Sequence, residues 1–154
     1  MRQRYWARSF SGWPVMNEAT PNEAHLQLAK LEALGFSSLL VTQNVDRLHQ
    51  KANHQKVVDL HGRIDQVECL DCAVLYSRGE IQAWLKQYNP QLSESAQITR
   101  PDGDAEVDSS IIENVKVPSC FRCDGVVKPN VVFYGSSVAK PVVEQVYRAL
   151  DKAD

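Results

Sequence analysis

The chain has 154 residues, of which 44% are apolar and 23% charged, a composition typical of one globular domain rather than of a disordered segment. Seventeen basic and 19 acidic residues leave a net charge of −2, so nucleic acid and anionic membranes are not expected as partners. No stretch approaches the roughly 18 apolar residues of a transmembrane helix, and the first ten residues lack the apolar core of a signal peptide.

Helix and strand alternate in the first part of the chain. The first 19 residues are rich in arginine and aromatic side chains but have no clear period. A helix is predicted to begin at Thr20-Pro21-Asn22-Glu23, where Thr20 caps it and Glu23 completes a capping box, and to end at Gly35. Three elements follow: a buried strand over residues 36–42, a short helix over 45–51 and a strand over 57–60.

The second part of the chain predicts fewer regular elements. They are an amphipathic helix over residues 80–88, a loop over 99–110, a strand over 131–134 that ends at Gly135, and a last helix over 141–153. Strand, helix and strand joined by tight connections are typical of α/β packing.

Four cysteines form two C-x-x-C pairs: Cys69, Cys72, Cys120 and Cys123. Two such turns can complete a tetrahedral zinc shell, and a closed shell of four thiolates is structural rather than catalytic. The 47 residues between the pairs, which include the helix over 80–88, are expected to be an insertion between two zinc knuckles. Two disulfides would require an oxidising compartment, and redox dithiols are a further alternative.

Polar side chains follow two predicted strands at the point where each strand ends. Gln43, Asn44 and Asp46 follow the first strand, and His61 follows the next. Ligands of open α/β sheets bind at the carboxyl ends of strands, and a neutral histidine is the usual general base. The alternative is that Asn and Asp are turn or cap residues and that the histidine is structural. The residues alone leave both interpretations open.

The order of several motifs resembles the core of the sirtuins, the NAD-dependent protein-lysine deacylases. The motifs are TQNVDRLHQKA, VVDLHG, CLDC and PSCFRCDGVVKPNVVFYG, and the resemblance covers nearly the whole chain. The segments LKQYNP and RPDGD resemble the class II branch, which holds bacterial members and mitochondrial sirtuins with lipoamidase and ADP-ribosyl-transfer activity.

The resemblance implies roles for the polar residues. Gln43 and Asn44 match amides that contact the ribose of NAD, and Asp46 matches the acid that holds the nicotinamide carboxamide. His61 matches the base that takes a proton from the ribose hydroxyls after the acyl oxygen has attacked C1′. The implied products are nicotinamide, the free lysine and O-acyl-ADP-ribose.

The resemblance also implies one structural zinc ion and a peptide-binding edge. The four cysteines match the zinc ligands. Val132, Phe133, Tyr134 and Gly135 match a strand that pairs with an acyl-lysine peptide, the implied protein substrate.

Three residues depart from the family pattern. Asn53 stands where glycine is usual, Tyr134 where phenylalanine is usual and Ser136 where an acid is common. The seven glycines lie at least ten residues apart, so they cannot form the family's glycine-rich phosphate loop. The family also continues beyond the last strand and helix of this chain. We therefore expect a fragment, with both ends of the nucleotide-binding fold missing.

The predicted fold is α/β: the central part of a Rossmann-like parallel-sheet domain with an inserted small zinc-binding module. Residues 1–62 and 129–154 are assigned to the Rossmann-like part, and 63–128 to the module. The predicted function is NAD-dependent protein-lysine deacylation, with the isolated chain inactive. The alternatives are a zinc-stabilised acyl-lysine peptide-binding module without turnover, or an ADP-ribosyltransferase or lipoamidase. We expect a cytoplasmic location in a bacterium, or a mitochondrial one in a eukaryote.

Overall fold

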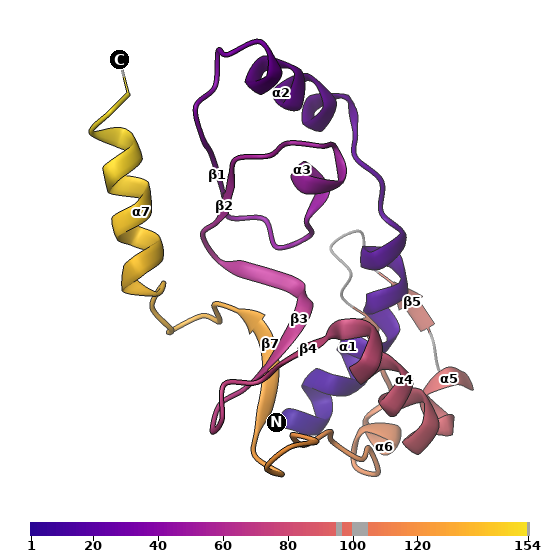
Figure 1. The fold of residues 1–154 in the computed structure, drawn as a ribbon. Coiled ribbons are helices and arrows are strands. Elements are labelled where there is room, and N and C mark those ends of the chain that lie inside the picture. Colours follow the sequence, from indigo (N-terminus) through magenta and orange to yellow (C-terminus); the bar gives the residue numbers. More distant parts are fainter. Residues whose placement is uncertain (95–96, 100–104, 154) are drawn as a thin grey trace. The chain divides into compact units, whose positions relative to one another are not determined.

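A computed structural model describes residues 1–94, 97–99 and 105–153 (Figure 1). The chain divides into two compact units. Unit 1 comprises Met1–Ala19 and Asp65–Pro129, and unit 2 comprises Thr20–Ile64 and Asn130–Asp154. Among the described residues, no helix has the length and apolar character needed to cross a bilayer.

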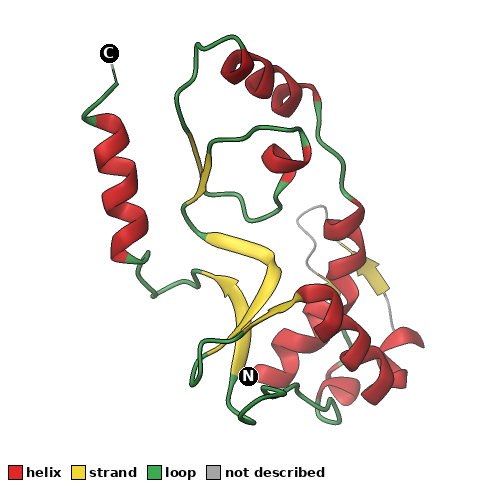
Figure 2. Ribbon diagram, in the orientation of Figure 1, coloured by secondary structure: helices red, strands yellow, loops and turns green. Residues whose placement is uncertain are grey.

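Unit 2 contains a short parallel strand pair with a helix between its strands, as predicted for an α/β fold (Figure 2). Its helices and strands are α2 (Glu23–Ala33), β1 (Leu40–Thr42), α3 (Leu48–Lys51), β2 (Val57–Asp59) and α7 (Lys140–Leu150). Strands β1 and β2 pair in parallel, with Leu40 opposite Val57 and Thr42 opposite Asp59. This register places the carboxyl ends of both strands side by side.

The N-cap of helix α2 lies two residues later than the capping residue predicted from the sequence. Asn22, not Thr20, is the N-cap: its side-chain oxygen accepts the backbone N–H of His25 at 3.2 Å. The side chain of His25 in turn accepts the N–H of Asn22, which completes the capping box. Asn is as good an N-cap as any residue, and here it stands one position ahead of the acidic first turn. The predicted helix end at Gly35 is confirmed, since this residue has a φ of 82°.

Three predicted strands are too long or misplaced. The strand over 36–42 keeps only its last three residues, and the strand over 57–60 ends at Asp59. The strand over 131–134 lies earlier, as β7 (Val127–Val131), and the chain then turns. Gly135 has a φ of 84° and Ser136 donates its N–H to the carbonyl of Phe133 at 2.9 Å, so the following residues close a turn instead of extending the strand.

Unit 1 contains most of the helices and an antiparallel sheet. Its elements are α1 (Arg2–Glu18), β3 (Gly62–Cys69), β4 (Leu75–Ser77), α4 (Arg78–Tyr88), α5 (Pro90–Glu94), β5 (Gln97–Thr99), β6 (Ala105–Glu106), α6 (Ser109–Ile112) and β7. The sheet has the order β4-β3-β7, and β5 pairs with β6. Strand β6 and helix α6 fall where a loop over 99–110 is predicted, while residues 100–104 of that loop lie outside the described part.

Helix α1 was not predicted from the sequence. Gly12 and Pro14 interrupt its apolar period, yet Trp6, Ala7 and Phe10 are buried in one core with residues of β3 and α4. The apolar burial of this helix places residues 1–19 in the unit that holds the four cysteines. The expected division, with residues 1–62 in the Rossmann-like part, therefore differs from the observed one over its first 19 residues.

A buried arginine joins α1 to α4. The side chain of Arg78 is 1% exposed and donates to the carbonyl and the hydroxyl of Ser9 at 3.0 and 3.1 Å. Its guanidinium lies 5.6 Å from the ring centre of Trp6 and 5.2 Å from that of Trp13. Burial lowers the pKa of Arg78 to about 10, so the group stays charged at neutral pH. Cation–π contacts and hydrogen bonds thus hold a charge inside unit 1.

Candidate functional site

The four cysteine sulfurs converge in unit 1, as the spacing of the two C-x-x-C pairs predicts. All four sulfurs lie within 4.8 Å of one another, and the Cys69–Cys123 and Cys72–Cys120 sulfurs are each 3.6 Å apart. Four ligands at 2.3 Å from a tetrahedral zinc ion would be about 3.8 Å apart. The thiols are free rather than paired in disulfides. Soft sulfur donors in this arrangement fit a structural zinc ion.

The two cysteine turns have the same backbone conformation. The residue after each pair has a positive φ, 55° at Ala73 and 58° at Asp124. The N–H of each of these residues donates to the carbonyl of the first cysteine of its pair, at 3.0 Å to Cys69 and 2.8 Å to Cys120. This left-handed turn directs both sulfurs of a pair to the same point, which explains the two-residue spacing.

Hydrogen bonds also link the two knuckles to each other. Leu70 donates its N–H to the carbonyl of Val126 at 2.8 Å, and Val126 donates its N–H to a carboxylate oxygen of Asp71 at 3.0 Å. A Cβ on Gly125 would collide with the Asp71 carboxylate, so a larger residue there would displace the carboxylate that accepts the Val126 N–H. The short segment after the second knuckle is therefore docked on the first knuckle.

The environment of Cys120 favours its thiolate. Burial raises the pKa of this thiol, but donors from the hydroxyl of Tyr76 and from the N–H groups of Arg122 and Cys123 outweigh burial and lower the pKa to about 6. The Tyr76 hydroxyl lies 3.1 Å from the Cys120 sulfur. Because thiolates are the metal-binding form, this sulfur is prepared for a cation near neutral pH.

In unit 2, the predicted polar residues gather at the carboxyl ends of β1 and β2. Asn44 lies two residues beyond Thr42, and His61 lies two residues beyond the Asp59 that pairs with Thr42. The parallel register thus places Asn44 and His61 at equivalent positions after neighbouring strands. The side chain of Asn44 is exposed and His61 is half-buried. A shared crevice at this end of the strands is what the sequence predicts.

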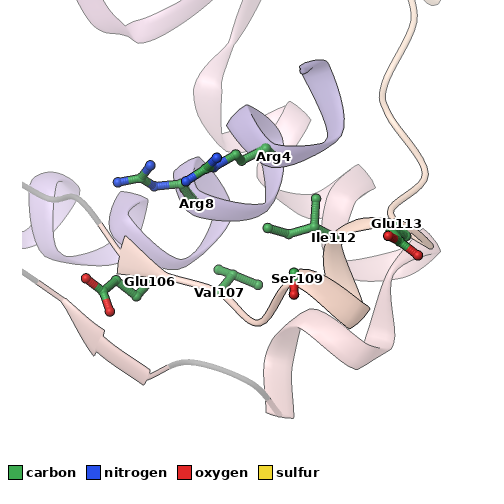
Figure 3. A pocket seen from close by; sticks show the side chains of 7 residues that line it. All are labelled: Arg4, Arg8, Glu106, Val107, Ser109, Ile112 and Glu113. Carbon is green, nitrogen blue, oxygen red and sulfur yellow. The ribbon is translucent and has the colours of Figure 1, made fainter.

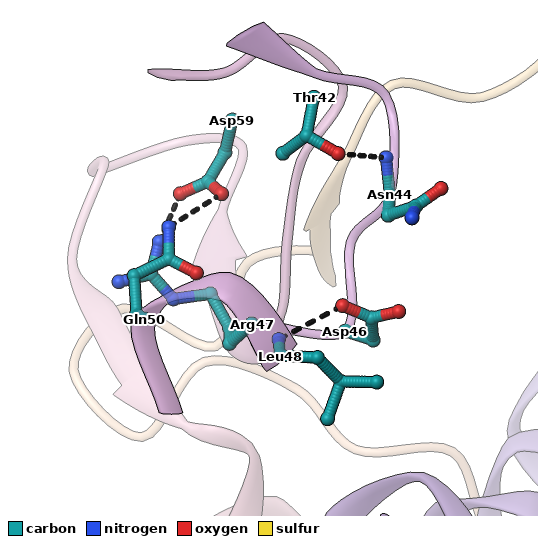
Figure 4. A network of polar contacts seen from close by, with 7 residues as sticks. All are labelled: Thr42, Asn44, Asp46, Arg47, Leu48, Gln50 and Asp59. Carbon is teal, nitrogen blue, oxygen red and sulfur yellow. Dashed lines mark hydrogen bonds and ion pairs between the residues drawn. The ribbon is translucent and has the colours of Figure 1, made fainter. Parts of the chain in front are cut away.

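Asp46 and Asn44 also have the local roles of the structural alternative (Figure 4). A carboxylate oxygen of Asp46 accepts the N–H of Leu48 at 2.9 Å, at the start of α3. The N–H of Asn44 donates to the Thr42 hydroxyl at 3.0 Å. Arg47, which follows Asp46, has a φ of 65°. This left-handed conformation explains why α3 begins at Leu48 rather than at the predicted residue 45. The hydrogen bonds of Asn44 with Thr42 and of Leu48 with Asp46 thus fix the backbone of this loop.

The backbone of His61 is fixed from two sides. Leu60 donates its N–H to the carbonyl of Thr42 at 2.8 Å, and the carbonyl of His61 accepts the N–H of Val132 at 2.9 Å. Gly62 has a φ of 79°, and a Cβ there would collide with the carbonyl of Asn130. The turn after β2 therefore lies tightly against the segment that follows β7, and a larger residue at position 62 would move the imidazole.

Sequence reasoning missed an acidic residue that organises this loop. Asp59 forms an ion pair with Arg47 and accepts a hydrogen bond from the Gln50 amide at 2.9 Å (Figure 4). The side chains of Arg47 and Asp59 are 21% and 15% exposed, so solvent screens the pair only in part. An acid inside the apolar run of β2 was the available signal, because such a residue needs a partner.

Two histidines of unit 2, His49 and His54, are buried close to the loop that follows β1. The ring of His49 is 4.7 Å from that of His25 and 6.2 Å from that of His54. Burial, followed by the charges of His25 and His54, lowers the pKa of His49, while Asp46 and Asp59 oppose the shift. The His54 Nε2 lies 3.6 Å from the Glu32 carboxylate, which accepts the N–H groups of Gln55 and Lys56 at 2.7 Å each. The lowered pKa means that a neutral imidazole suits the buried position of His49.

Unit 1 has a separate pocket of about 500 Å³ between α1 and the β6–α6 segment (Figure 3). Its lining residues are Arg4, Arg8, Glu106, Val107, Ser109, Ile112 and Glu113. None of them is a site residue predicted from the sequence. Arginines and glutamates balance one another around this pocket, so its charge alone selects no ligand.

The whole chain, residues 1–154, matches a protein-family model described as the Sir2 family. It is 49% identical over 153 residues to an "NAD-dependent protein deacetylase" of Xanthomonas campestris pv. campestris (strain 8004), covering 99% of this chain and 52% of that protein. It is 44% identical over 146 residues to the Drosophila melanogaster "NAD-dependent protein deacylase Sirt4", covering 95% of this chain and 47% of that protein. The chain thus spans about half the length of these curated relatives.

Solved structures give the same result. The structure titled "Sir2 bound to acetylated peptide" matches with a TM-score of 0.62 at 29% identity, covering 84% of this chain and 43% of that one. The structure titled "Sir2-p53 peptide-NAD+" matches with a TM-score of 0.59 at 32% identity, with coverage of 84% and 43%. By its sequence, its fold and its paired cysteine knuckles, the chain belongs to the Sir2 family.

Proposed function

We propose that this chain carries the acyl-lysine side, the general base and the zinc module of an NAD-dependent protein-lysine deacylase. The observation that carries the proposal is the parallel register of β1 and β2, which places Asn44 and His61 at equivalent positions after adjacent strands. Relatives named as NAD-dependent deacetylases and deacylases support this assignment. The acyl-lysine of a protein is the proposed substrate, and NAD is the co-substrate.

Each polar residue has a separate task in the proposed reaction. NAD, when bound, supplies the ribose carbon that receives the acyl oxygen and the nicotinamide that leaves. Gln43 and Asn44 orient the ribose as neutral hydrogen-bonding groups, and Asp46 holds the nicotinamide carboxamide with its carboxylate. His61 accepts a proton from a ribose hydroxyl through its neutral imidazole. The backbone hydrogen bonds from Leu60 to Thr42 and from Val132 to His61 hold the chain around that imidazole in place.

The zinc ion has a structural role in this proposal. The four thiolates of Cys69, Cys72, Cys120 and Cys123 would fill its coordination shell, which leaves no position for substrate. The peptide is proposed to contact Val132, Phe133, Tyr134 and Gly135 in the turn after β7 rather than in an extended strand. Phe133 and Tyr134 are exposed there, with 39% and 109% of their reference surface accessible.

The test is nicotinamide release from NAD in the presence of an acetyl-lysine peptide. His61→Ala should lower the rate at least ~100-fold, since general-base catalysis contributes that much or more. His25→Gln is a matched control, because Gln also serves at the third position of a capping box and should leave the rate unchanged. Because the isolated chain is expected to be inactive, the two variants are compared in a protein extended to the length of its relatives. Equal rates there with His61 and with His61→Ala would contradict the role of His61.

A second candidate is an acyl-lysine peptide-binding module without turnover. The wide spacing of the seven glycines, which leaves no glycine-rich phosphate loop, favours it. Fluorescence polarisation with a labelled acetyl-lysine peptide and its unacetylated control distinguishes the two. Selective peptide binding without nicotinamide release would support the module, and release that depends on His61 would support the enzyme.

A cytoplasmic location in a bacterium is part of the proposal, and fractionation of cells that express the tagged protein would test it.

A further inference from the structure

We propose that the hydroxyl of Tyr76 is a positioning group for the zinc centre, which it stabilises by donating a hydrogen bond to the Cys120 thiolate. The hydroxyl lies 3.1 Å from the Cys120 sulfur. A zinc-bound thiolate carries no proton, so in the loaded site the phenol is necessarily the donor. The residue would act on the metal through its ligand, without coordinating the metal itself.

The sheet brings Tyr76 to this sulfur. Tyr76 lies in β4 and pairs with Val67 of the neighbouring antiparallel strand β3. Strand β3 ends at Cys69, the first cysteine of the first knuckle. Tyr76 therefore lies next to the first knuckle, whereas its hydrogen-bond partner, Cys120, belongs to the second knuckle. The contact joins the two halves of the metal site through a side chain.

A second ring holds the phenol in place. The ring of Phe121, the residue directly after Cys120, lies 4.9 Å from the ring of Tyr76 at an interplanar angle of 62°. Such an edge-to-face pair is favourable beyond the burial of its surface. Phe121 is 53% exposed, so the pairing with Tyr76 accounts for an aromatic side chain at this position better than core burial does.

Cys120 differs from the other three cysteines because a side chain other than a cysteine contacts its sulfur. Among the residues that the structure describes, Tyr76 is the one residue other than the cysteines whose side chain lies within hydrogen-bonding distance of these four sulfurs. Cys69 accepts a backbone N–H from Asp71 at 3.4 Å instead. Hydrogen bonds to a ligand sulfur spread its negative charge and fix its direction, and loss of an outer-shell partner of this kind typically costs 10–100-fold in metal affinity.

The experiment compares zinc release from the zinc-loaded chain and from Tyr76→Phe, with a coloured chelator in excess at neutral pH. We expect release from Tyr76→Phe to be about 10-fold faster, because the ring remains and only the donor is lost. Tyr88→Phe is the matched control, since this exposed tyrosine of the same unit lies on α4. It should release zinc at the rate of the unchanged chain.

A spectroscopic measurement separates the hydrogen bond from general loosening. In the Co²⁺-substituted chain, the sulfur-to-cobalt charge-transfer band should move to lower energy in Tyr76→Phe, because an unbonded thiolate gives up charge more readily. Phe121→Leu keeps the hydroxyl but removes its ring support, so it should give a smaller effect in the same direction. This second variant carries the test if Tyr76→Phe does not fold. Unchanged release and an unchanged band in the folded variants, or a chain without zinc, would overturn the proposal.

Discussion

Different interactions stabilise the interior of each of the two units. The buried hydrophobic cluster lies entirely in unit 1, around Trp6, Val67, Ile81 and Leu85, and the cysteine knuckles belong to the same unit. In unit 2, helices α2 and α7 have no buried residue. Capping groups, the Arg47–Asp59 ion pair and the buried histidines organise that unit instead. Stability and proposed chemistry are thus concentrated in different parts of the molecule.

The two units can be followed separately by spectroscopy. The three tryptophans, Trp6, Trp13 and Trp84, all lie in unit 1. Tryptophan fluorescence therefore reports on this unit alone, and amide hydrogen exchange over α2 and α3 reports on unit 2.

The largest expected effect is that of metal removal. Cys72→Ser, or chelation of the unchanged chain, should shift tryptophan emission to longer wavelength, because Trp6 is 1% exposed in the folded unit. Structural zinc sites contribute about 10–16 kcal/mol of apparent binding free energy, more than a domain's usual stability. Zinc added back after chelation should restore the emission. A simultaneous loss of amide protection in α3 of unit 2 would contradict the separate basis of stability.

A matched pair of leucines gives the next effect. Leu85 is 0% exposed in unit 1 and Leu34 is 61% exposed in unit 2. Leu85→Ala should lower the free energy of unfolding by about 3 kcal/mol, because it leaves a cavity in a packed core. Leu34→Ala should change it by less than about 0.5 kcal/mol. Urea unfolding measures these free energies, by tryptophan fluorescence for Leu85→Ala and by circular dichroism for both variants. Equal losses of unfolding free energy in the two variants would remove the distinction between the units.

The smallest effect concerns pH and unit 2. Because the pKa of His49 is lowered in the folded chain, the unfolded chain binds its proton more readily. The neutral ring therefore stabilises the fold fully above about pH 6.5, the unfolded value, and this contribution is lost as pH falls through the folded pKa. The charges that face this ring are those of His25, His54, Asp46 and Asp59.

Hydrogen exchange over α3 at pH 7.5 and 5.5 should show faster opening at the lower pH after correction for intrinsic rates. His49→Phe, which cannot take up a proton, should reduce this pH dependence. An identical dependence in the variant would assign the effect to other groups.

The sequence predicted the convergence of the four cysteines and the pairing of β1 with β2 better than it predicted the bounds of the surrounding elements. Paired cysteines are a local pattern in which spacing alone directs the sulfurs, and the structure brings them together. The strand–helix–strand order with polar residues at the strand ends was equally local, and β1 and β2 pair as expected. Helix α1 was missed because Gly12 and Pro14 conceal its apolar face, which is defined by its partners in β3 and α4. The turn after β7 was read as strand because Val132 and Phe133 suit either conformation.

The assembled knuckles bear on how this module can evolve. The Asp71–Val126 and Leu70–Val126 contacts close the 47-residue segment between the cysteine pairs at its base. For a chain closed in this way, doubling the length of the enclosed segment costs only ~0.6 kcal/mol of additional entropy. Insertions into the parts of that segment that lie outside the buried cluster should therefore accumulate among relatives at little energetic cost. The two knuckles at its ends should keep nearly constant length and geometry.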